Sequence, residues 1–392
     1  MLVELLLILV AIAISLPCAI LFMECFSALF APSSVRLRHY KDIDIAVLMP
    51  AHNEADVIGK TLATLIPQLG PTDRLIVVAD NCTDKTAEIA RAAGATVVER
   101  TDSALRGKGY ALDYGLNLLS AAPPTAVVIF DADCRVYRGS LQRLAAEAVF
   151  QQSPVQSVYL IERPLRPTLK ESVSLFSFKV KNLVRPLGLA RLGFPCFLTG
   201  TGMAFPWEVI AKTDLANGSI VEDMKLGLDL AILGKAPVLC AAVTVLAPIP
   251  PCDADAKTQR TRWEHGHLQM IARYCPQLML AAVSQGRVDL LALALDLSVP
   301  PLALLLMLWL AVSSVLTIAS VTTGLWLSTL ICYSGGLALL IAVFLAWVRF
   351  AQADISLKTL LSVPAYVLWK IPVYLKFIKS PETEWVRTNR KI

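Results

Sequence analysis

Residues 126–133 read AVVIFDAD, an apolar run that ends in two acidic residues. A short run of β-branched residues of this kind predicts a buried strand. The same alternation of apolar runs and helical patterns recurs, which predicts strands at 45–51, 74–80, 95–100 and 157–162 and helices at 55–68, 84–93, 107–120 and 138–151. Strands separated by helices of this length form a mainly parallel sheet with right-handed crossovers. The sequence therefore predicts an α/β domain.

Polar side chains follow three of the predicted strands. In chain order they are His52, Asn53 and Glu54, then Asp80, Asn81 and Asp84, and finally Asp131 and Asp133. Ligands of open α/β sheets bind at the carboxyl ends of the strands, so we expect these side chains to converge. Carboxylates that converge repel one another unless a cation or a donor-rich ligand lies among them.

Each of these clusters also has a simpler explanation, because Asn, Asp and Thr are favoured at the N-caps of helices. For Asn81 and Thr83, capping and ligand binding stay open as alternatives. Asp131 and Asp133 directly follow an apolar strand, and oxygen ligands at i and i+2 suit Mg²⁺ or Mn²⁺ bridging substrate phosphates. For this pair we favour the metal interpretation.

The segment Arg106-Gly107-Lys108-Gly109 opens a predicted helix, where a lysine and backbone N–H groups could meet a phosphate. A glycine-rich turn before an exposed helix is the alternative. The segment TGTG at 199–202 predicts a close backbone approach to a ligand. Walker A, G-x-G-x-x-G and G-x-S-x-G motifs are absent from the sequence, which argues against P-loop NTPases, classical dinucleotide enzymes and α/β hydrolases.

Two further motifs lie downstream. Glu222 and Asp223 begin a helical stretch, where a carboxylate either pairs with the helix dipole or acts as a general base. Gln259, Arg262 and Trp263 stand at i, i+3 and i+4, so one helix face presents an amide, a guanidinium and an indole. A guanidinium suits phosphate oxygens, and an indole packs on a sugar ring or a lipid edge.

The composition argues against a purely soluble protein, since 56% of the residues are hydrophobic and only 17% are charged. Nine cysteines without a C-x-x-C pair indicate a reducing compartment rather than a disulfide framework or a zinc ribbon. His265 and His267 lack the i, i+4 spacing of a helical zinc motif and are expected in an interfacial turn.

Three segments are expected to cross a membrane. They are residues 5–31, whose one charge is Glu24, residues 291–319 with a kink at Pro300 and Pro301, and residues 325–348. Residues 357–379 mix Lys, Pro, Tyr and Trp with apolar residues, which suits a helix lying in the membrane interface.

Basic residues set the expected orientation. Arg36, Arg38 and Lys41 follow the first span, and residues 349–392 carry eight basic and three acidic side chains. The positive-inside rule places the α/β domain and this tail in the cytoplasm and the N-terminus outside, with the plasma (inner) membrane as the expected location. The tail suits an anionic lipid surface better than nucleic acid, and a solvated tail is the alternative.

These features divide the chain into five expected parts. They are an anchor at 1–35, a cytosolic α/β domain at 36–265, an interfacial helix region at 266–290, two spans at 291–348, and an interfacial helix with the basic tail at 349–392.

The motif order Asp80, Asp131-x-Asp133, Glu222-Asp223 and Gln259-x-x-Arg262-Trp263, bracketed by membrane segments, resembles the membrane-integrated family 2 glycosyltransferases. That family contains cellulose, chitin and hyaluronan synthases and ceramide glucosyltransferase. The resemblance covers residues 44–265 and implies a Rossmann-like GT-A fold. It also implies a nucleotide-diphosphate sugar donor, in most cases a UDP-sugar, a divalent metal (Mg²⁺ or Mn²⁺), and inversion at the anomeric carbon.

The resemblance implies a role for each matching residue. Asp223 would be the general base that deprotonates the acceptor hydroxyl. The donor would be bound by Asn53, Glu54, Asp80, Lys108, Asp131 and Asp133, the last two through the metal. The diphosphate and the acceptor sugar would be held by Glu222, Gln259, Arg262 and Trp263.

Two departures from the family pattern bear on the product. Val221 stands where the synthases often have Thr, and three spans are too few to enclose a polysaccharide tunnel. We therefore expect a single transfer to a lipid-linked or glycan acceptor at the cytosolic membrane face, in exopolysaccharide or glycolipid biosynthesis. A processive synthase that works with partner membrane proteins and an inactive membrane scaffold with a nucleotide-sugar-binding fold are the alternatives.

Overall fold

The computed structural model describes residues 2–31, 43–216, 220–249, 253–361, 370–374 and 377, without the side chains of 253–255. Packing divides the described residues into two compact units. Unit 1 holds residues 2–31, 163–194 and those from 267 onward, and unit 2 holds those of 43–162 and 195–266. The α/β domain expected as one stretch is therefore interrupted by residues 163–194, which pack with unit 1.

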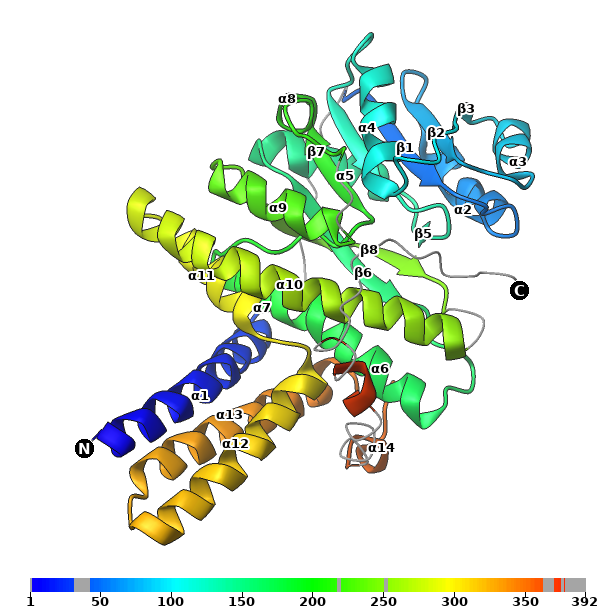
Figure 1. Cartoon of the computed structure of the whole chain (residues 1–392). Helices are drawn as coiled ribbons and strands as arrows, with labels where there is room; N and C mark the ends of the chain where they lie inside the picture. The colour runs from blue at the N-terminus through cyan, green and yellow to red at the C-terminus, as the bar shows by residue number, and fades with distance from the viewer. Residues whose placement is uncertain are drawn as a thin grey trace. The chain divides into compact units, whose positions relative to one another are not determined.

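Unit 2 is built on a sheet that has eight strands among the described residues (Figure 1). The strands are β1 (Ile45–Ala51), β2 (Arg74–Asp80), β3 (Thr96–Arg100), β4 (Ala126–Ile129), β5 (Arg135–Val136), β6 (Val155–Ile161), β7 (Met203–Pro206) and β8 (Val238–Ala247). Their order is β3-β2-β1-β4-β7-β6-β8-β5. The α/β fold class is confirmed, and β1 to β4 pair in parallel as expected. The sheet as a whole is mixed, because β7 runs antiparallel to β4 and β6 and β5 runs antiparallel to β8.

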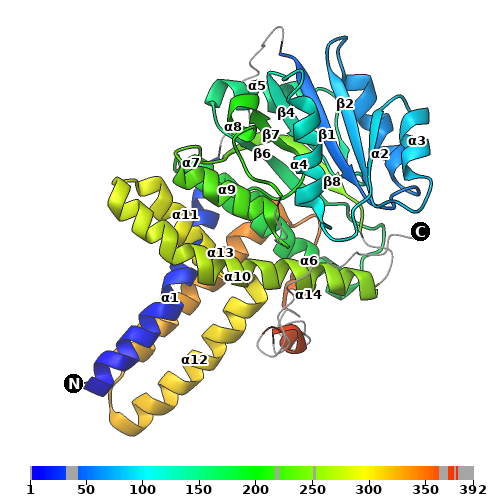
Figure 2. The ribbon, with the colours of Figure 1, turned by 45° about the horizontal axis from the view of Figure 1, so that its top comes forward.

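Helices cover this sheet. They are α2 (Ile58–Leu65), the 3₁₀ turn η1 (Ile66–Gln68), α3 (Thr86–Ala92), α4 (Lys108–Leu119), α5 (Ser140–Gln151), α8 (Trp207–Ile210) and α9 (Glu222–Ile232). Leu112 and Leu116 of α4 share a buried cluster with Leu48 of β1 and Val78 of β2, and Figure 2 shows α4 lying along these strands. Burial of this apolar face is what holds α4, and with it Lys108 at its first position, against the sheet.

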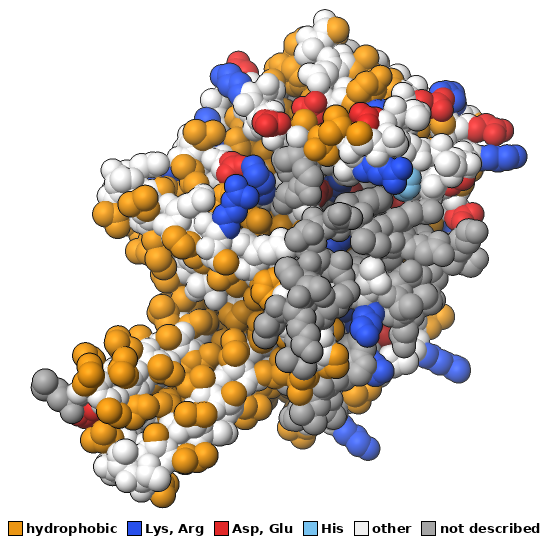
Figure 3. Space-filling view, viewed as in Figure 1, with side chains coloured by type: hydrophobic (Ala, Val, Ile, Leu, Met, Phe, Trp, Pro, Cys, Tyr) orange, Lys and Arg blue, Asp and Glu red, His pale blue; other side chains and the backbone are white. Residues whose placement is uncertain are grey.

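Unit 1 is helical. Its elements are α1 (Leu2–Ala28), α6 (Leu169–Lys179), the π-helical turn η2 (Val180–Val184), α7 (Arg185–Arg191), α11 (Val288–Ser298), α12 (Leu302–Thr323), α13 (Leu327–Phe350) and α14 (Leu357–Leu361). It also holds the second part of α10 (Asp253–Gln285), from residue 267 onward. Within the described ranges, α1, α12 and α13 are long and apolar enough to cross a membrane, and their outer surface is dominated by hydrophobic side chains (Figure 3).

Three membrane spans were expected and three such helices are present, but one boundary is wrong. The span expected at 291–319 with a kink is instead two helices, because α11 ends at Ser298 and α12 begins at Leu302. The cause is the Pro300-Pro301 pair, since each proline lacks a backbone N–H and disfavours a helical conformation in the residue before it.

The charge in the first span is neutralised inside unit 1. Glu24 of α1 accepts from Arg185 Nε at 2.7 Å, and Arg185 Nη2 also donates to the side chain of Asp296 and, at 2.7 Å, to its carbonyl. All three residues are buried. This Glu24–Arg185–Asp296 triad connects α1 to α7 and α11. Removing one partner of a buried ion pair strongly destabilises the fold, because the other charge is left buried without its partner.

The interfacial turn expected at His265 and His267 is wrong, because both residues lie inside α10. Thr261 and His265 are both buried and stand four residues apart, which is the spacing of one helix face. His267 is also buried, with Nε2 at 3.3 Å from the carbonyl of Leu297.

Several expectations about the membrane ends concern residues that the structure does not describe. Arg36, Arg38 and Lys41 lie outside the described residues, as does most of the basic tail. Of the interfacial helix expected at 357–379, α14 and residues 370–374 are helical, and residues 362–369 lie outside the described part.

Candidate active site

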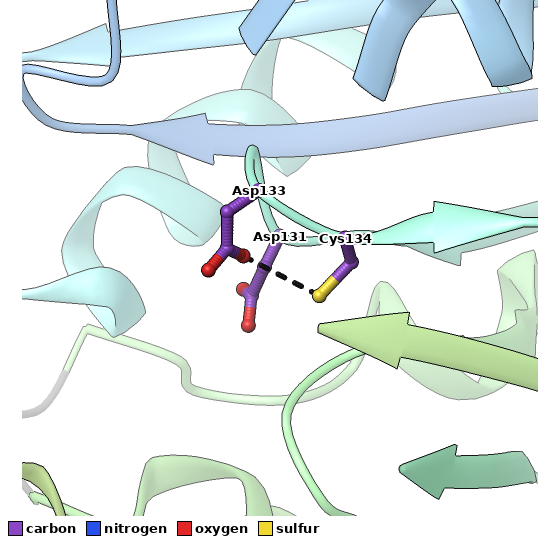
Figure 4. A group of neighbouring side chains, drawn as sticks. All are labelled: Asp131, Asp133 and Cys134. Carbon is purple, nitrogen blue, oxygen red and sulfur yellow. Dashed lines mark hydrogen bonds between the residues drawn. The ribbon is translucent and has the colours of Figure 1, made fainter. Parts of the chain in front are cut away.

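The acidic pair that follows β4 forms a compact group of possible metal ligands. One ligand atom each of Asp131, Asp133 and Cys134 lies within 4.8 Å of the others (Figure 4). Asp131 is half-buried, Asp133 is 9% exposed and Cys134 is fully buried. Two carboxylates at i and i+2 are the oxygen donors that Mg²⁺ and Mn²⁺ prefer, so this group fits a divalent metal.

Cys134 was not singled out in the sequence. Its Sγ donates to Asp133 Oδ1 at 3.3 Å (Figure 4). Burial, and then the negative charges of Asp133 and Asp131, raise the pKa of the Cys134 thiol well above its ordinary value, so the thiol keeps its proton. Cys134 is therefore a hydrogen-bond donor that orients the Asp133 carboxylate.

Lys108 joins the acidic pair to a second segment of the chain. Its Nζ donates to Asp131 Oδ1 and, at 2.7 Å, to the carbonyl of Gly200. Burial alone would lower the pKa of Lys108, but the negative charges of Asp131, Glu222 and Asp223 outweigh it and raise that pKa above its ordinary value. Lys108 is thus a fixed positive charge at the centre of the carboxylates.

Gly200 lets Lys108 and Asp223 come close to the same backbone. Its φ is +92°, and a Cβ built on it would lie 3.1 Å from Asp223 Oδ2 and 3.4 Å from Lys108 Nζ. The close approach expected at the TGTG segment was to a ligand, and that stays a prediction. The groups that approach it here are side chains of the chain itself, which brings Asp223 into the same cluster as Asp131.

Glu222 and Asp223 occupy the first turn of α9, as the sequence predicted. Burial and the negative charge of Asp223 raise the pKa of Glu222 from 4.5 to about 7, and the positive charges of Lys108 and Arg262 partly offset this. A carboxyl group with a pKa near neutrality gains or loses a proton under working conditions, which is a property of functional sites.

The helix that carries Gln259, Arg262 and Trp263 lies next to this turn. A Cβ on Gly266 of α10 would be 2.5 Å from Val221 Cγ1, so the backbone of α10 packs directly against the residue before α9. Gln259, Arg262 and Trp263 are half-buried on α10. The positive charge of Arg262 lowers the pKa of Glu222.

Asp80 lies at the neighbouring strand end and has its own cation. Its Oδ1 accepts from Arg100 Nη1 at 2.7 Å and from Asn81 Nδ2 at 3.1 Å. Arg100 also donates to Asp102 Oδ2 at 3.2 Å and stacks on Tyr110. The register of β2 and β3 pairs Asp80 with Arg100, so a strand pairing supplies this partner. The converging carboxylates were expected to need a cation or a donor-rich ligand, and among the described residues Arg100 and Lys108 donate to Asp80 and Asp131.

A family model described as "Glycosyltransferase like family 2" matches residues 43–266, more than half of the chain. The chain belongs to this family. The matched residues comprise the described part of unit 2 and the inserted residues 163–194, and they are called the glycosyltransferase domain below.

The chain is similar to known proteins over part of its length. It is 35% identical over 115 residues to the 4,4'-diaponeurosporenoate glycosyltransferase of Staphylococcus aureus strain USA300, which is 29% of this chain and 28% of that enzyme. It is 31% identical over 150 residues to the enzyme of the same name from the bovine strain RF122, 38% of this chain and 37% of that enzyme. The chain therefore matches less than two fifths of the length of these relatives.

Among solved structures, the chain resembles the mannosyltransferase PcManGT of Pyrobaculum calidifontis, determined in complex with GDP-Man and Mn²⁺. The TM-score is 0.56 at 18% identity, with 96% of this chain and 100% of that chain covered. At this identity the likeness bears on the fold, and it confirms the GT-A architecture expected for the glycosyltransferase domain.

In the glycosyltransferase domain, the loops that follow β1 and β2 are joined by hydrogen bonds. Thr83 N–H donates to Asn53 Oδ1 at 2.7 Å, and Glu54 N–H donates to Thr86 Oγ1 at 2.7 Å. Asn53 has a φ of +54°. Asn53 and Glu54, expected at the nucleobase and ribose, are thereby held beside the end of β2, where Asp80 stands.

The capping interpretation of Asn81 and Thr83 is wrong for the described helix. α3 begins at Thr86, beyond both residues. Asn81 Oδ1 instead accepts from Asp102 N–H at 2.8 Å, and Asp84 Oδ1 accepts from Thr86 N–H at 2.9 Å. Asp84 therefore satisfies a backbone donor of the first helical turn, and Asn81 ties the β2 loop to the loop after β3.

Proposed function

We propose that the chain is an inverting glycosyltransferase that moves a sugar from a nucleotide-diphosphate sugar, with UDP-sugars as the first class to test, to a lipid-linked or glycan acceptor. Because the chain belongs to this family, one observation is enough to support the proposal. Lys108 and Gly200 gather Asp131 and Asp223 around one point, where a metal ligand and a candidate base meet.

Asp223 is proposed as the general base. Its Oδ2 lies beside the backbone of Gly200, whose carbonyl accepts a hydrogen bond from the same Lys108 ammonium that donates to Asp131. A base at this position would take the proton of the acceptor hydroxyl as that oxygen attacks the anomeric carbon. Inversion follows when the attacking oxygen and the leaving diphosphate are on opposite faces of the sugar.

The second requirement is to stabilise the negative charge that develops on the leaving diphosphate. Lys108 and Arg262 are the cations that this chain would present to it, and Asn53, Glu54 and Asp80 would line the nucleoside end. Gln259 and Trp263, on the same helix as Arg262, would contact the acceptor sugar, with Glu222 beside them.

Asp131 and Asp133 would hold Mg²⁺ or Mn²⁺, oriented by the thiol of Cys134. When bound, this metal would neutralise the charge that develops on the diphosphate. The fit rests on the donor set of the chain, two carboxylates and a hydrogen-bonding thiol within 4.8 Å.

The membrane helices support an acceptor that is lipid-linked. We propose that α1, α12 and α13 anchor the enzyme in a plasma (inner) membrane, with the glycosyltransferase domain in the cytoplasm and the N-terminus outside. We also propose the domain limits expected from the sequence, with the difference that residues 163–194, which lie inside the stretch matched by the family model, pack with unit 1.

The test is sugar transfer in membranes that contain the full chain. Radiolabelled UDP-glucose, UDP-N-acetylglucosamine and GDP-mannose are supplied with Mg²⁺ or Mn²⁺, and products are partitioned between organic solvent and the insoluble residue. Label in the organic phase that is lost in Asp223→Asn supports the proposal. Asp229→Asn, which changes a half-buried carboxylate paired with Lys225 on the same helix, is the matched control and should keep activity.

The same partition separates the alternatives. Label in a long insoluble or water-soluble polymer would mean a processive synthase that works with partner membrane proteins. Absence of transfer from every donor, combined with nucleotide binding, would favour an inactive scaffold. Full activity in Asp223→Asn would overturn the assignment of the base.

A further inference from the structure

Lys108 is bound to one of the two carboxylates that the proposed function assigns to the metal. Its ammonium donates to Asp131 Oδ1 and to the carbonyl of Gly200, and its side chain is 17% exposed. A divalent cation held by Asp131 would bind the same carboxylate, whose Oδ1 already accepts from Lys108. Lysine and metal therefore compete for one carboxylate.

The electrostatics explain why a cation is needed there at all times. Asp131, Glu222 and Asp223 all act on Lys108 with negative charge, and burial makes isolated carboxylates costly. An ammonium and a divalent metal on the same carboxylate repel each other at contact distance. Binding of the metal must then weaken the bond between Lys108 and Asp131.

The Lys108 ammonium has a second possible binding partner, a phosphate at the N-terminus of α4. It is the first residue of α4, preceded by Gly107 with a φ of +130°. Backbone N–H groups at a helix N-terminus attract phosphate, and a lysine side chain is a flexible stem that ends in a point charge. A lysine released from Asp131 would stay beside the position that a donor diphosphate takes.

We propose that Lys108 is an internal cation that holds Asp131 while the metal is absent and transfers to the donor diphosphate when the metal binds. This inference rests on the proposed function, because it needs Asp131 as a metal ligand. It assigns Lys108 a role before donor binding as well as during transfer.

The first test measures the affinity of the nucleotide-free full chain in detergent for Mn²⁺, from the electron paramagnetic resonance signal of the free ion. Lys108→Met removes the competing charge, so we expect Mn²⁺ to bind more tightly, on the order of 10-fold. Lys108→Arg keeps the charge and should bind Mn²⁺ much as the unchanged chain does. Lys60→Met removes an exposed lysine of α2 and is the matched control.

The second test follows the release of Lys108 directly. Acetylation of each lysine is quantified by mass spectrometry with and without Mn²⁺. Mn²⁺ should increase the acetylation rate of Lys108 several-fold and leave Lys60 unchanged. A Lys108 that is protected by Mn²⁺, or unaffected by it, would overturn the proposed transfer.

Asp133→Asn separates the two levels of the proposal. If Mn²⁺ binds this variant as it binds the unchanged chain, the metal site of the proposed function is wrong. If Asp133→Asn loses Mn²⁺ while Lys108→Met binds it equally or more weakly, the metal site stands and the role of Lys108 as its competitor is refuted.

Discussion

Replacing Glu222 by Gln should stabilise the glycosyltransferase domain at pH 8 and change its stability little at pH 5. The reason is the pKa of Glu222, which burial and the charge of Asp223 raise from 4.5 to about 7 against the opposing charges of Lys108 and Arg262. The folded protein therefore holds a proton on Glu222 more tightly than the unfolded chain does.

The sign and size follow from this difference. A carboxyl group with a raised pKa in the folded state favours folding fully below pH 4.5, and this contribution is lost as the pH rises to about 7. Each pKa unit corresponds to about 1.4 kcal/mol, so ionised Glu222 destabilises the domain by about 3 kcal/mol above pH 7. Gln cannot ionise and avoids this loss. For a domain of this size the gain is roughly 6–12 °C in Tm.

The assay is thermal unfolding of the full chain in detergent at pH 5 and pH 8, with no nucleotide or metal added. Glu208→Gln, which changes an exposed carboxylate on α8, is the control and should shift Tm equally little at both pH values. A Glu222→Gln variant that is no more stable than the unchanged chain at pH 8, or that gains equally at pH 5, would refute the reasoning.

Three further predictions concern packing and hydrogen bonds. Arg185→Met leaves two buried carboxylates without their cation and should lower stability by about 3–5 kcal/mol, measured by thermal unfolding in detergent; Arg185→Lys should lose less. Gly266→Ala places a Cβ 2.5 Å from Val221 Cγ1, so sugar transfer should fall, and adding Val221→Ala should restore part of it. Cys134→Ala removes the donor to Asp133 and should weaken Mn²⁺ binding on the order of 10-fold, whereas Cys134→Ser, which keeps a donor, should not; equal binding by both variants would contradict this.

The half of the sheet that carries the polar loops could be predicted from the sequence, because β1, β2 and β4 are continuous apolar runs. In the other half, the strand expected at 157–162 is present as β6, but β5, β7 and β8 were not predicted. β7 has four residues and β5 has two, too short to show a period, and they exist because they pair with β4, β6 and β8. Such pairings depend on contacts between distant segments, which a local pattern does not contain.

The candidate site shows the same division. Asp131, Asp133 and Asp223 were predicted as acidic residues beside strand or helix ends, and the structure gathers Asp131 and Asp223 around Lys108. The partners of these acidic residues were harder to predict. Arg100 pairs with Asp80 through the register of β2 and β3, and residues 163–194 pack with the helices of unit 1 rather than with the sheet. Register and insertion are decided by the whole fold.

The Glu24–Arg185–Asp296 triad has a consequence for how the protein is made and how it can be engineered. Glu24 is translated 161 residues before Arg185. The ion pair between them therefore forms only after Arg185 has been synthesised. A generic hydrophobic leader would lack this carboxylate, and a truncation that removes α1 would leave the arginine with one partner fewer. Helix α1 is therefore not an exchangeable segment, and a shortened version of the protein has to be designed around Arg185 rather than cut at residue 31.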